Sequence, residues 1–240
     1  MFQVRAFAAV LLASLVAACG AGRNFAMPAD GALKLGVTTT SDALSLLGAP
    51  YQKNQETVTS VATTGGPVSV FSPIKQPGTY DRFTYIFLDT SRQGVISGAL
   101  AGGRQRPERV LQLVFWNGKL VSYGSNSSFE NDSTNFDENR IAQIERGRTR
   151  GAEVVQMMGK LPSGTAIYPM IAAPEGRTIT YNFSEADLPN NERHRKFLAV
   201  YLDRDDVVRD MQSENTTNPL PIQPAAPAPG VVPIFVPRGK

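Results

Sequence analysis

Two stretches of this 240-residue chain share one spacing of glycine, threonine and apolar residues, namely residues 36–48 and residues 147–159. In both, a threonine follows the first glycine by two positions and a second glycine follows it by twelve. Apolar pairs lie seven and eight, then ten and eleven, positions after the first glycine. This spacing gathers the apolar residues on one side of a short helix. It predicts two helices that begin at Thr38 and Thr149 as N-caps and end at the second glycines.

The residues after each helical stretch have the patterns of strands. Phe83–Phe87 and Ile179–Phe183 alternate apolar or aromatic with polar residues, as half-buried strands do. Apolar runs separated by short polar turns then predict hairpins over 110–123 and 197–211. The first hairpin turns at Asn117-Gly118, a pair of residues that tolerates the positive φ angles of tight hairpins.

A further short helix is expected before the second stretch, over 137–144, with Asp137 as its cap. The order of elements then predicts an α+β fold of two tandem α-α-β-β-β units. In each unit, short helices would pack on a three-stranded antiparallel meander. The first unit is expected over 33–128 and the second over 137–211.

The N-terminus predicts export from the cytoplasm. Residues 6–16 are almost purely apolar and follow one positive charge. About eleven apolar residues are too few for a bilayer, which takes ~20, but they suit a signal peptide. The run ends in Ala17-Ala18-Cys19, which resembles the lipobox of bacterial lipoproteins and holds the one cysteine of the chain. We expect a signal peptide over 1–18 and a lipidated tether over 19–32; the alternative is an ordinary secretory signal with a chance cysteine.

The glycine-threonine helix pattern and its strands, behind a lipobox, resemble the SmpA/OmlA (BamE-like) lipoproteins over roughly 33–123 and 137–211. The resemblance implies a palmitate-bearing anchor and an accessory role in β-barrel assembly at the outer membrane. Gly20, rather than Asp, follows Cys19, and by resemblance to Gram-negative sorting rules this favours the outer membrane. The tandem α+β arrangement is also similar to that of the β-lactamase-inhibitor-protein group.

The composition excludes several kinds of site. One histidine and one cysteine exclude a disulfide framework within the chain, a zinc cluster of the usual kind and a multi-histidine metal site. A formal charge of +3 is too small to favour nucleic acid as a partner. The one histidine, His194, lies in a charged turn with no nucleophile motif nearby. We therefore expect a protein that is not an enzyme and needs no cofactor.

Candidate contact residues lie near two long connections, 51–80 and 89–108. Within the second, residues 94–103 form an apolar, glycine-rich run that would either touch lipid or a partner, or partly cover the sheet. Trp116 at the hairpin turn would either pack on the sheet or meet a partner. Nearby arginines would either bind phosphate groups of anionic lipid or form solvated surface balanced by acids; they are Arg104, Arg106 and Arg109.

The last 29 residues, 212–240, contain seven prolines and predict an extended tail. Its apolar end, 231–236, would be either a docking strand or a solvated segment. Together these features predict a non-enzymatic lipoprotein on the periplasmic side of the outer membrane. It would bind other envelope proteins in envelope maintenance or β-barrel assembly. The alternative is an inhibitor-like module that binds a periplasmic enzyme.

Overall fold

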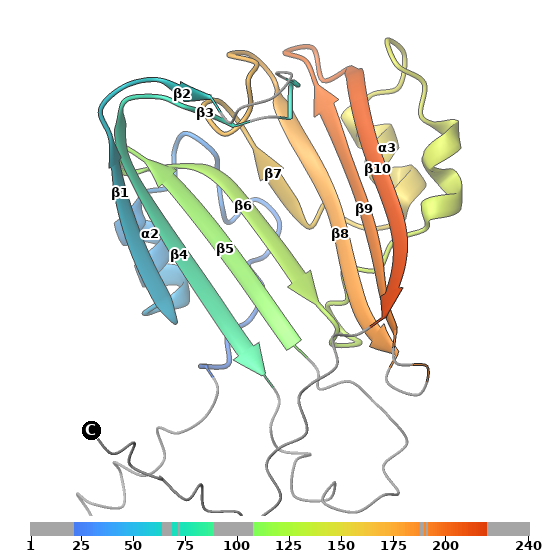
Figure 1. The fold of residues 1–240 in the computed structure, drawn as a ribbon, viewed down its shortest axis with the longest axis horizontal. Coiled ribbons are helices and arrows are strands. Elements are labelled where there is room, and N and C mark those ends of the chain that lie inside the picture. Colours follow the sequence, from blue (N-terminus) through green and yellow to red (C-terminus); the bar gives the residue numbers. More distant parts are fainter. Residues whose placement is uncertain are drawn as a thin grey trace, which may run out of the picture.

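The computed structural model describes residues 22–63, 69–71, 73–88, 108–187, 190 and 192–219. Within them the chain forms one eight-stranded antiparallel sheet, in the order β1-β4-β5-β6-β7-β8-β9-β10, and a separate two-stranded hairpin, β2-β3 (Figure 1). The helices are α2 (Thr40–Leu47), α3 (Gly151–Met158) and the 3-10 helix η2 (Glu138–Gln143). The strands are β1 (Gln52–Val58), β2 (Ala62–Thr63), β3 (Ile74–Lys75), β4 (Gly78–Leu88), β5 (Glu108–Trp116), β6 (Lys119–Ser127), β7 (Gly164–Ala166), β8 (Arg177–Asp187), β9 (Glu192–Leu202) and β10 (Val208–Pro219).

The prediction of two tandem α-α-β-β-β units is wrong, because the strands form one continuous sheet. The three residues of β7 pair with β6 on one side and with β8 on the other. Gly164 permits this junction, since a Cβ there would lie 2.6 Å from Thr180 Oγ1 and 2.7 Å from the Tyr123 carbonyl oxygen. The helix content was also overestimated: among the described residues each half has one short α-helix, and the helix expected over 137–144 is 3-10.

Both α-helices lie on the same side of the sheet (Figure 1). Helix α2 buries Ala43 and Leu47 in a cluster with inward-facing residues of β4, β5 and β6. Helix α3 buries Val154 and Met158 in a second cluster with residues of β8, β9 and β10. The sheet therefore has a covered face, against the helices, and an opposite face that we call the open face.

The N-terminal segment packs on the covered face, although residues 19–32 were expected to be a tether. Phe25 and Leu33 are buried in the first cluster beside α2. Gly22 forms an antiparallel bridge with Phe87 near the end of β4. The tether prediction is therefore wrong from Gly22 onward, because the segment carries apolar side chains that the first core needs.

Each helix begins one residue later than predicted. Thr39 is the N-cap of α2: its Oγ1 accepts the Asp42 N–H at 3.2 Å, and the Asp42 carboxylate accepts the Thr39 N–H at 2.8 Å. These contacts, led by the Thr39 N–H, lower the pKa of Asp42. Thr38 and Thr149 instead accept the backbone N–H four residues earlier, at 2.8 Å in both cases, and so close the turn that leads into each helix.

The long connections hold structure that the sequence did not reveal. The 51–80 connection contains β1 and the β2–β3 hairpin. Strand β10 continues to Pro219, so the first eight residues of the predicted tail belong to the sheet. The 94–103 run and the 231–236 segment lie outside the described residues.

Candidate functional site

Arg109, a candidate for surface contact, is instead buried on the covered face with 7% of its surface exposed. Its Nε donates to Asp132 Oδ2 at 2.6 Å. Its Nη1 donates to the Phe25 carbonyl oxygen at 2.7 Å and to Asn24 Oδ1 at 3.2 Å. The guanidinium also lies 4.6 Å from the ring centroid of Phe129. We call this group the Arg109 node; it uses the arginine for internal contacts, so Arg109 is not available to lipid.

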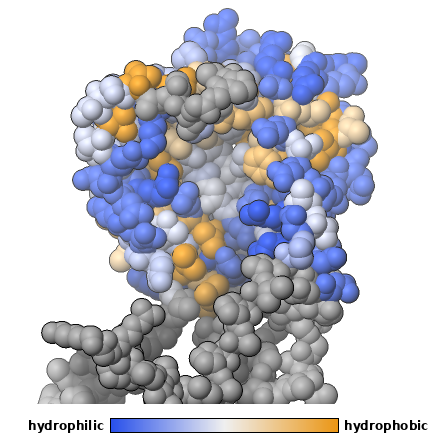
Figure 2. Space-filling view, in the orientation of Figure 1, coloured by the Kyte–Doolittle hydropathy of each residue, from blue (hydrophilic) through white to orange (hydrophobic). Residues whose placement is uncertain are grey.

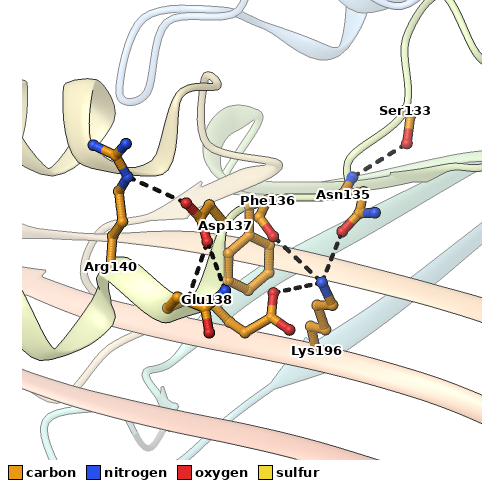
Figure 3. Close-up of polar contacts among 8 residues, drawn as sticks. Ser133, Asn135, Phe136, Asp137, Glu138, Arg140 and Lys196 are labelled. Atoms are coloured by element: carbon orange, nitrogen blue, oxygen red, sulfur yellow. Dashed lines mark hydrogen bonds and ion pairs between the residues drawn. The ribbon is translucent and has the colours of Figure 1, made fainter.

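A matching group surrounds Lys196 in the second half of the chain (Figure 3). Lys196 Nζ donates to Glu138 Oε2 at 2.5 Å, to Asn135 Oδ1 at 3.2 Å and to the Phe136 carbonyl oxygen at 3.5 Å. The hydrogen bond from Lys196 lowers the pKa of Glu138. We call this group the Lys196 node; it ties η2 and the residues before it to β9.

The two nodes are copies of one arrangement. The Asn-Phe pair at 24–25 recurs at 135–136, and 111 positions separate the two pairs. The same 111 positions separate Thr38 from Thr149. In both copies a strand cation holds the asparagine oxygen and the phenylalanine carbonyl oxygen. This part of the repeat was not predicted, although the offset of 111 between the helices, extended toward the N-terminus, leads to it.

The phenylalanine of each pair packs on a strand tyrosine, but the two tyrosines differ. The ring centroids of Phe25 and Tyr85 are 5.8 Å apart, and those of Phe136 and Tyr181 are 5.5 Å apart. The two pairs of rings are tilted by similar angles. The Tyr85 hydroxyl donates to the Gly48 carbonyl oxygen at 3.2 Å, at the end of α2. The Tyr181 hydroxyl is buried with no hydrogen-bond partner among the described residues, and burial raises its pKa. Tyr181 therefore acts as a neutral core residue.

The open face combines apolar and polar side chains without a covering helix. Figure 2 shows hydrophilic and hydrophobic residues around a hollowed region. Strand alternation places half-buried Val110, Phe197 and Tyr201 on this face, together with exposed Gln112 and Asn182. Such a mixture, with aromatic residues among polar ones, is typical of surfaces that bind other proteins.

A hollow of about 170 Å³ lies where the open face meets the β2–β3 hairpin. Tyr80 and Val114 line it from the sheet, and Pro169 and Met170 line it from the connection after β7. The Ile74 N–H donates to the Pro169 carbonyl oxygen at 3.1 Å, which joins connections from the two halves of the chain. Ligand pockets usually occupy ~300–1,000 Å³, so this hollow suits a single side chain better than a small molecule or cofactor.

Arg82 is the cation of this hollow. It projects from β4 onto the open face, in register with Asn54 on β1 and Val114 on β5, and it is exposed. Within the described ranges, its guanidinium has neither an ion pair nor a hydrogen bond. At the rim, Lys75 Nζ and Glu56 Oε1 pair at 2.5 Å. The hollow therefore offers an apolar surface beside an uncommitted arginine. No residue spacing around Arg82 could have distinguished it in advance.

The other candidate contact residues divide between the open face and the undescribed part of the chain. Trp116 is half-buried beside Tyr80 and Val114, and its Nε1 donates to the Pro77 carbonyl oxygen at 3.3 Å. Its ring meets the Tyr168 ring edge-on, with centroids 6.3 Å apart. Trp116 thus supports the end of the open face that adjoins the hollow. Cys19, Arg104 and Arg106 lie outside the described residues.

His194 lies at an exposed end of β9. Its Nδ1 is 2.9 Å from Thr217 Oγ1, and its Nε2 is 3.9 Å from Glu192 Oε2. A hydroxyl, an imidazole and a carboxylate are therefore neighbours, but the carboxylate lies beyond the ~2.6–3.2 Å at which a catalytic base is normally oriented.

The part of the chain that the structure describes contains no group of three or more histidine, cysteine or acidic side chains placed to hold a metal ion. It also has no helix long and apolar enough to cross a membrane.

The sequence matches no protein-family model and no curated protein. Among solved structures, it is similar to one from Streptococcus mutans described as a "putative beta-lactamase inhibitor protein". That match has 11% identity and a TM-score of 0.37, and it covers 74% of this chain and 82% of the other. Similarity to the inhibitor group is limited to this weak match, and no comparison supports the SmpA/OmlA family.

Proposed function

We propose that this protein is a lipoprotein of the outer membrane that faces the periplasm and binds another envelope protein through its open face. Its role would be non-catalytic, in envelope maintenance or in the assembly of outer-membrane β-barrels. The lipobox-like sequence that ends at Cys19, after an apolar run of signal-peptide length, supports the anchor. Several acyl chains, at ~0.8 kcal/mol per buried CH₂, would hold such a protein on the bilayer permanently.

The observation that carries the binding role is the hollow beside Arg82. Arginine and aromatic residues are enriched at the centres of protein interfaces, because a planar guanidinium and a rigid ring give large contacts at low entropic cost. Here Arg82 is exposed and uncommitted, while Tyr80 and Val114 next to it are already buried. A partner that brings a carboxylate next to an apolar group would satisfy both parts of the hollow.

Several other cations of the described residues are already paired. Arg109 and Lys196 are committed to internal carboxylates and carbonyl oxygens. Arg177 and Arg209 pair with acidic side chains at 2.8 Å and 2.6 Å. Surface ion pairs of this kind are worth little in stability, yet they occupy the cation. Arg82 is instead open to a partner.

Site-specific photocrosslinking in intact cells tests this proposal. A photoreactive residue at Gln112, on the open face, should capture a defined envelope protein, and Arg82→Glu should weaken that capture. The same residue at Ser45, exposed on α2, is the matched control on the opposite side of the sheet. Equal adducts from both positions would contradict binding through the open face. Capture of a soluble periplasmic enzyme whose activity then falls would instead favour an inhibitor-like module.

A further inference from the structure

The N-terminal end of the folded body is fixed to one end of the sheet. Gly22 pairs with Phe87, one residue before β4 ends at Leu88. Gly22 has φ of +88°, and a Cβ at this position would lie 2.0 Å from the Ile86 carbonyl oxygen. The close approach and the positive φ both require glycine. The chain is therefore held against the end of β4 from Gly22 onward.

The next residues reinforce this attachment. Asn24 and the Phe25 carbonyl oxygen accept hydrogen bonds from buried Arg109, and the Phe25 side chain is 8% exposed. An Arg side chain that donates to two acceptors and also pairs with Asp132 is a strong, charge-assisted anchor. The first residues of the folded body therefore cannot separate from the sheet without disrupting its core.

The sequence leaves three residue steps between Cys19 and Gly22. A fully extended chain spans at most ~3.3–3.6 Å per residue, so this link reaches no further than about 11 Å. A lipid on Cys19 would thus hold Gly22 close to the bilayer surface. By comparison, the expected tether over 19–32 would have allowed the body to move freely at several times that distance.

We propose that the acylated protein stands on the membrane with one end of its sheet toward the lipid and the open face upright; this rests on the lipidation of Cys19 proposed above. The membrane-proximal end is the one where β4 ends, β5 begins and β6 ends, at Leu88, Glu108 and Ser127. The distal end carries the β2–β3 hairpin (Figure 1). Trp116, the last residue of β5, and the hollow also lie at this end.

The strand lengths set the height of the binding face. Strand β4 has eleven residues and rises about 3.3 Å per residue, so its two ends are roughly 35 Å apart. Tyr80 and Arg82, which line the hollow from β4, lie seven and five residues from Phe87, or roughly 17–23 Å along the strand. With a link of at most about 11 Å, this side of the hollow stands no more than about 35 Å from the lipid surface. The kind of partner that fits is an envelope protein embedded in or anchored to the same membrane, which presents its surface at this height.

Fluorescence energy transfer on vesicles tests the orientation. The full-length acylated protein is purified in three versions, each with a donor dye at one introduced cysteine: Glu130→Cys near the proximal end, Gln112→Cys midway, and Val61→Cys at the distal end. All three native positions are exposed. Acceptor dyes are placed on lipid headgroups of phospholipid vesicles. We expect the donor-to-surface distance to increase from Glu130 to Gln112 to Val61, by about 30 Å in total.

A linker variant is the matched control. Twenty glycine and serine residues inserted after Gly20 add a flexible span of roughly 25 Å and should remove most of the gradient. Equal distances for the three dyes without the linker would overturn the orientation, provided that thermal unfolding matches the unlabelled protein. Mass spectrometry of the N-terminal peptide separates this outcome from failure of the anchor. Absence of acyl chains would refute the lipidation itself, whereas acylated protein without a gradient would refute only the orientation.

Discussion

Replacing Phe25 with alanine tests whether the N-terminal segment belongs to the core. Phe25 is 8% exposed, packs 5.8 Å from the Tyr85 ring and lies under the Arg109 guanidinium at 5.9 Å. Truncation of a buried phenylalanine costs ~3–5 kcal/mol, of which a lost aromatic pair accounts for ~0.5–1.5 kcal/mol. Because Phe25 lies at the border of its cluster, we expect the lower part of this range, about 3 kcal/mol.

The measurement is urea or thermal unfolding of the mature chain with Cys19→Ser, which removes the lipid. A loss of about 3 kcal/mol corresponds to a fall in Tm of about 6–12 °C for a domain of this size. Phe136→Ala, at the equivalent position of the second half, should cost a similar amount, since Phe136 is 4% exposed and packs on Tyr181 in the same way. Val37→Ala, at a position 61% exposed, should change the free energy of unfolding by less than ~0.5 kcal/mol.

The informative comparison is between the two phenylalanines. If Phe136→Ala costs about 3 kcal/mol while Phe25→Ala costs less than about 1 kcal/mol, the N-terminal segment does not contribute to the core. The folded body would then begin later in the chain, and the short link between Cys19 and the sheet would lose its basis.

Three further outcomes are expected. Tyr85→Phe should lower the free energy of unfolding by ~1 kcal/mol, because it removes a hydrogen bond. Tyr181→Phe removes a buried hydroxyl with no described partner, so it should be neutral or stabilising in the same denaturation assay. The hydrogen bond from Lys196 lowers the pKa of Glu138. The stability that this hydrogen bond contributes is therefore present above the ordinary pKa of 4.5 and is lost as the pH falls through the lowered pKa. The unfolding free energies of the wild type and Glu138→Gln should therefore converge below about pH 4, and a constant difference down to pH 2 would contradict this coupling. Arg82→Glu should leave Tm within about 2 °C of the wild type, because the guanidinium has no described partner to lose; a larger fall would show a structural role.

Local signals in the sequence predicted local structure well. The Asn117-Gly118 turn is confirmed, with φ of +49° and +77° at the two residues, because the left-handed region admits few other pairs. The apolar spacing of the two helices predicted the buried side only in part: Leu47 is 8% exposed and Met158 is 1% exposed, whereas Leu44 and Leu46 of the first helix are 38% and 50% exposed. In these cases the residue types alone limit the backbone or the burial.

The continuity of the sheet could not be read from the sequence. Its junction, β7, has only three residues, which is too short for an alternation pattern to be recognised. What makes the junction possible is the missing side chain of Gly164, and a lone glycine is equally typical of a loop. The two repeats therefore suggested two units, where long-range pairing in fact joins them.

The roles of individual arginines were equally hidden. Arg104, Arg106 and Arg109 looked alike in the sequence, yet Arg109 is buried because Asp132 and the Phe25 carbonyl oxygen converge on it from distant segments. Arg82 could not be predicted as a contact residue, because nothing within β4 distinguishes an arginine on the open face from an ordinary solvated one. Whether each arginine is buried or exposed depends on segments that lie far away in the sequence.

The two copies of the repeat also differ in the lengths of their connections. The offset between equivalent positions is 111 at the helices, 96 from Phe83 to Ile179 and 87 from Leu111 to Leu198. The first copy is therefore the longer one, and its additional residues fall in the connections before and after β4. The earlier connection supplies β1 and the β2–β3 hairpin, which border the hollow. The second copy has short connections and the first has long ones that build additional surface, so homologous chains should concentrate their insertions and deletions in the first copy and preserve the length of the second.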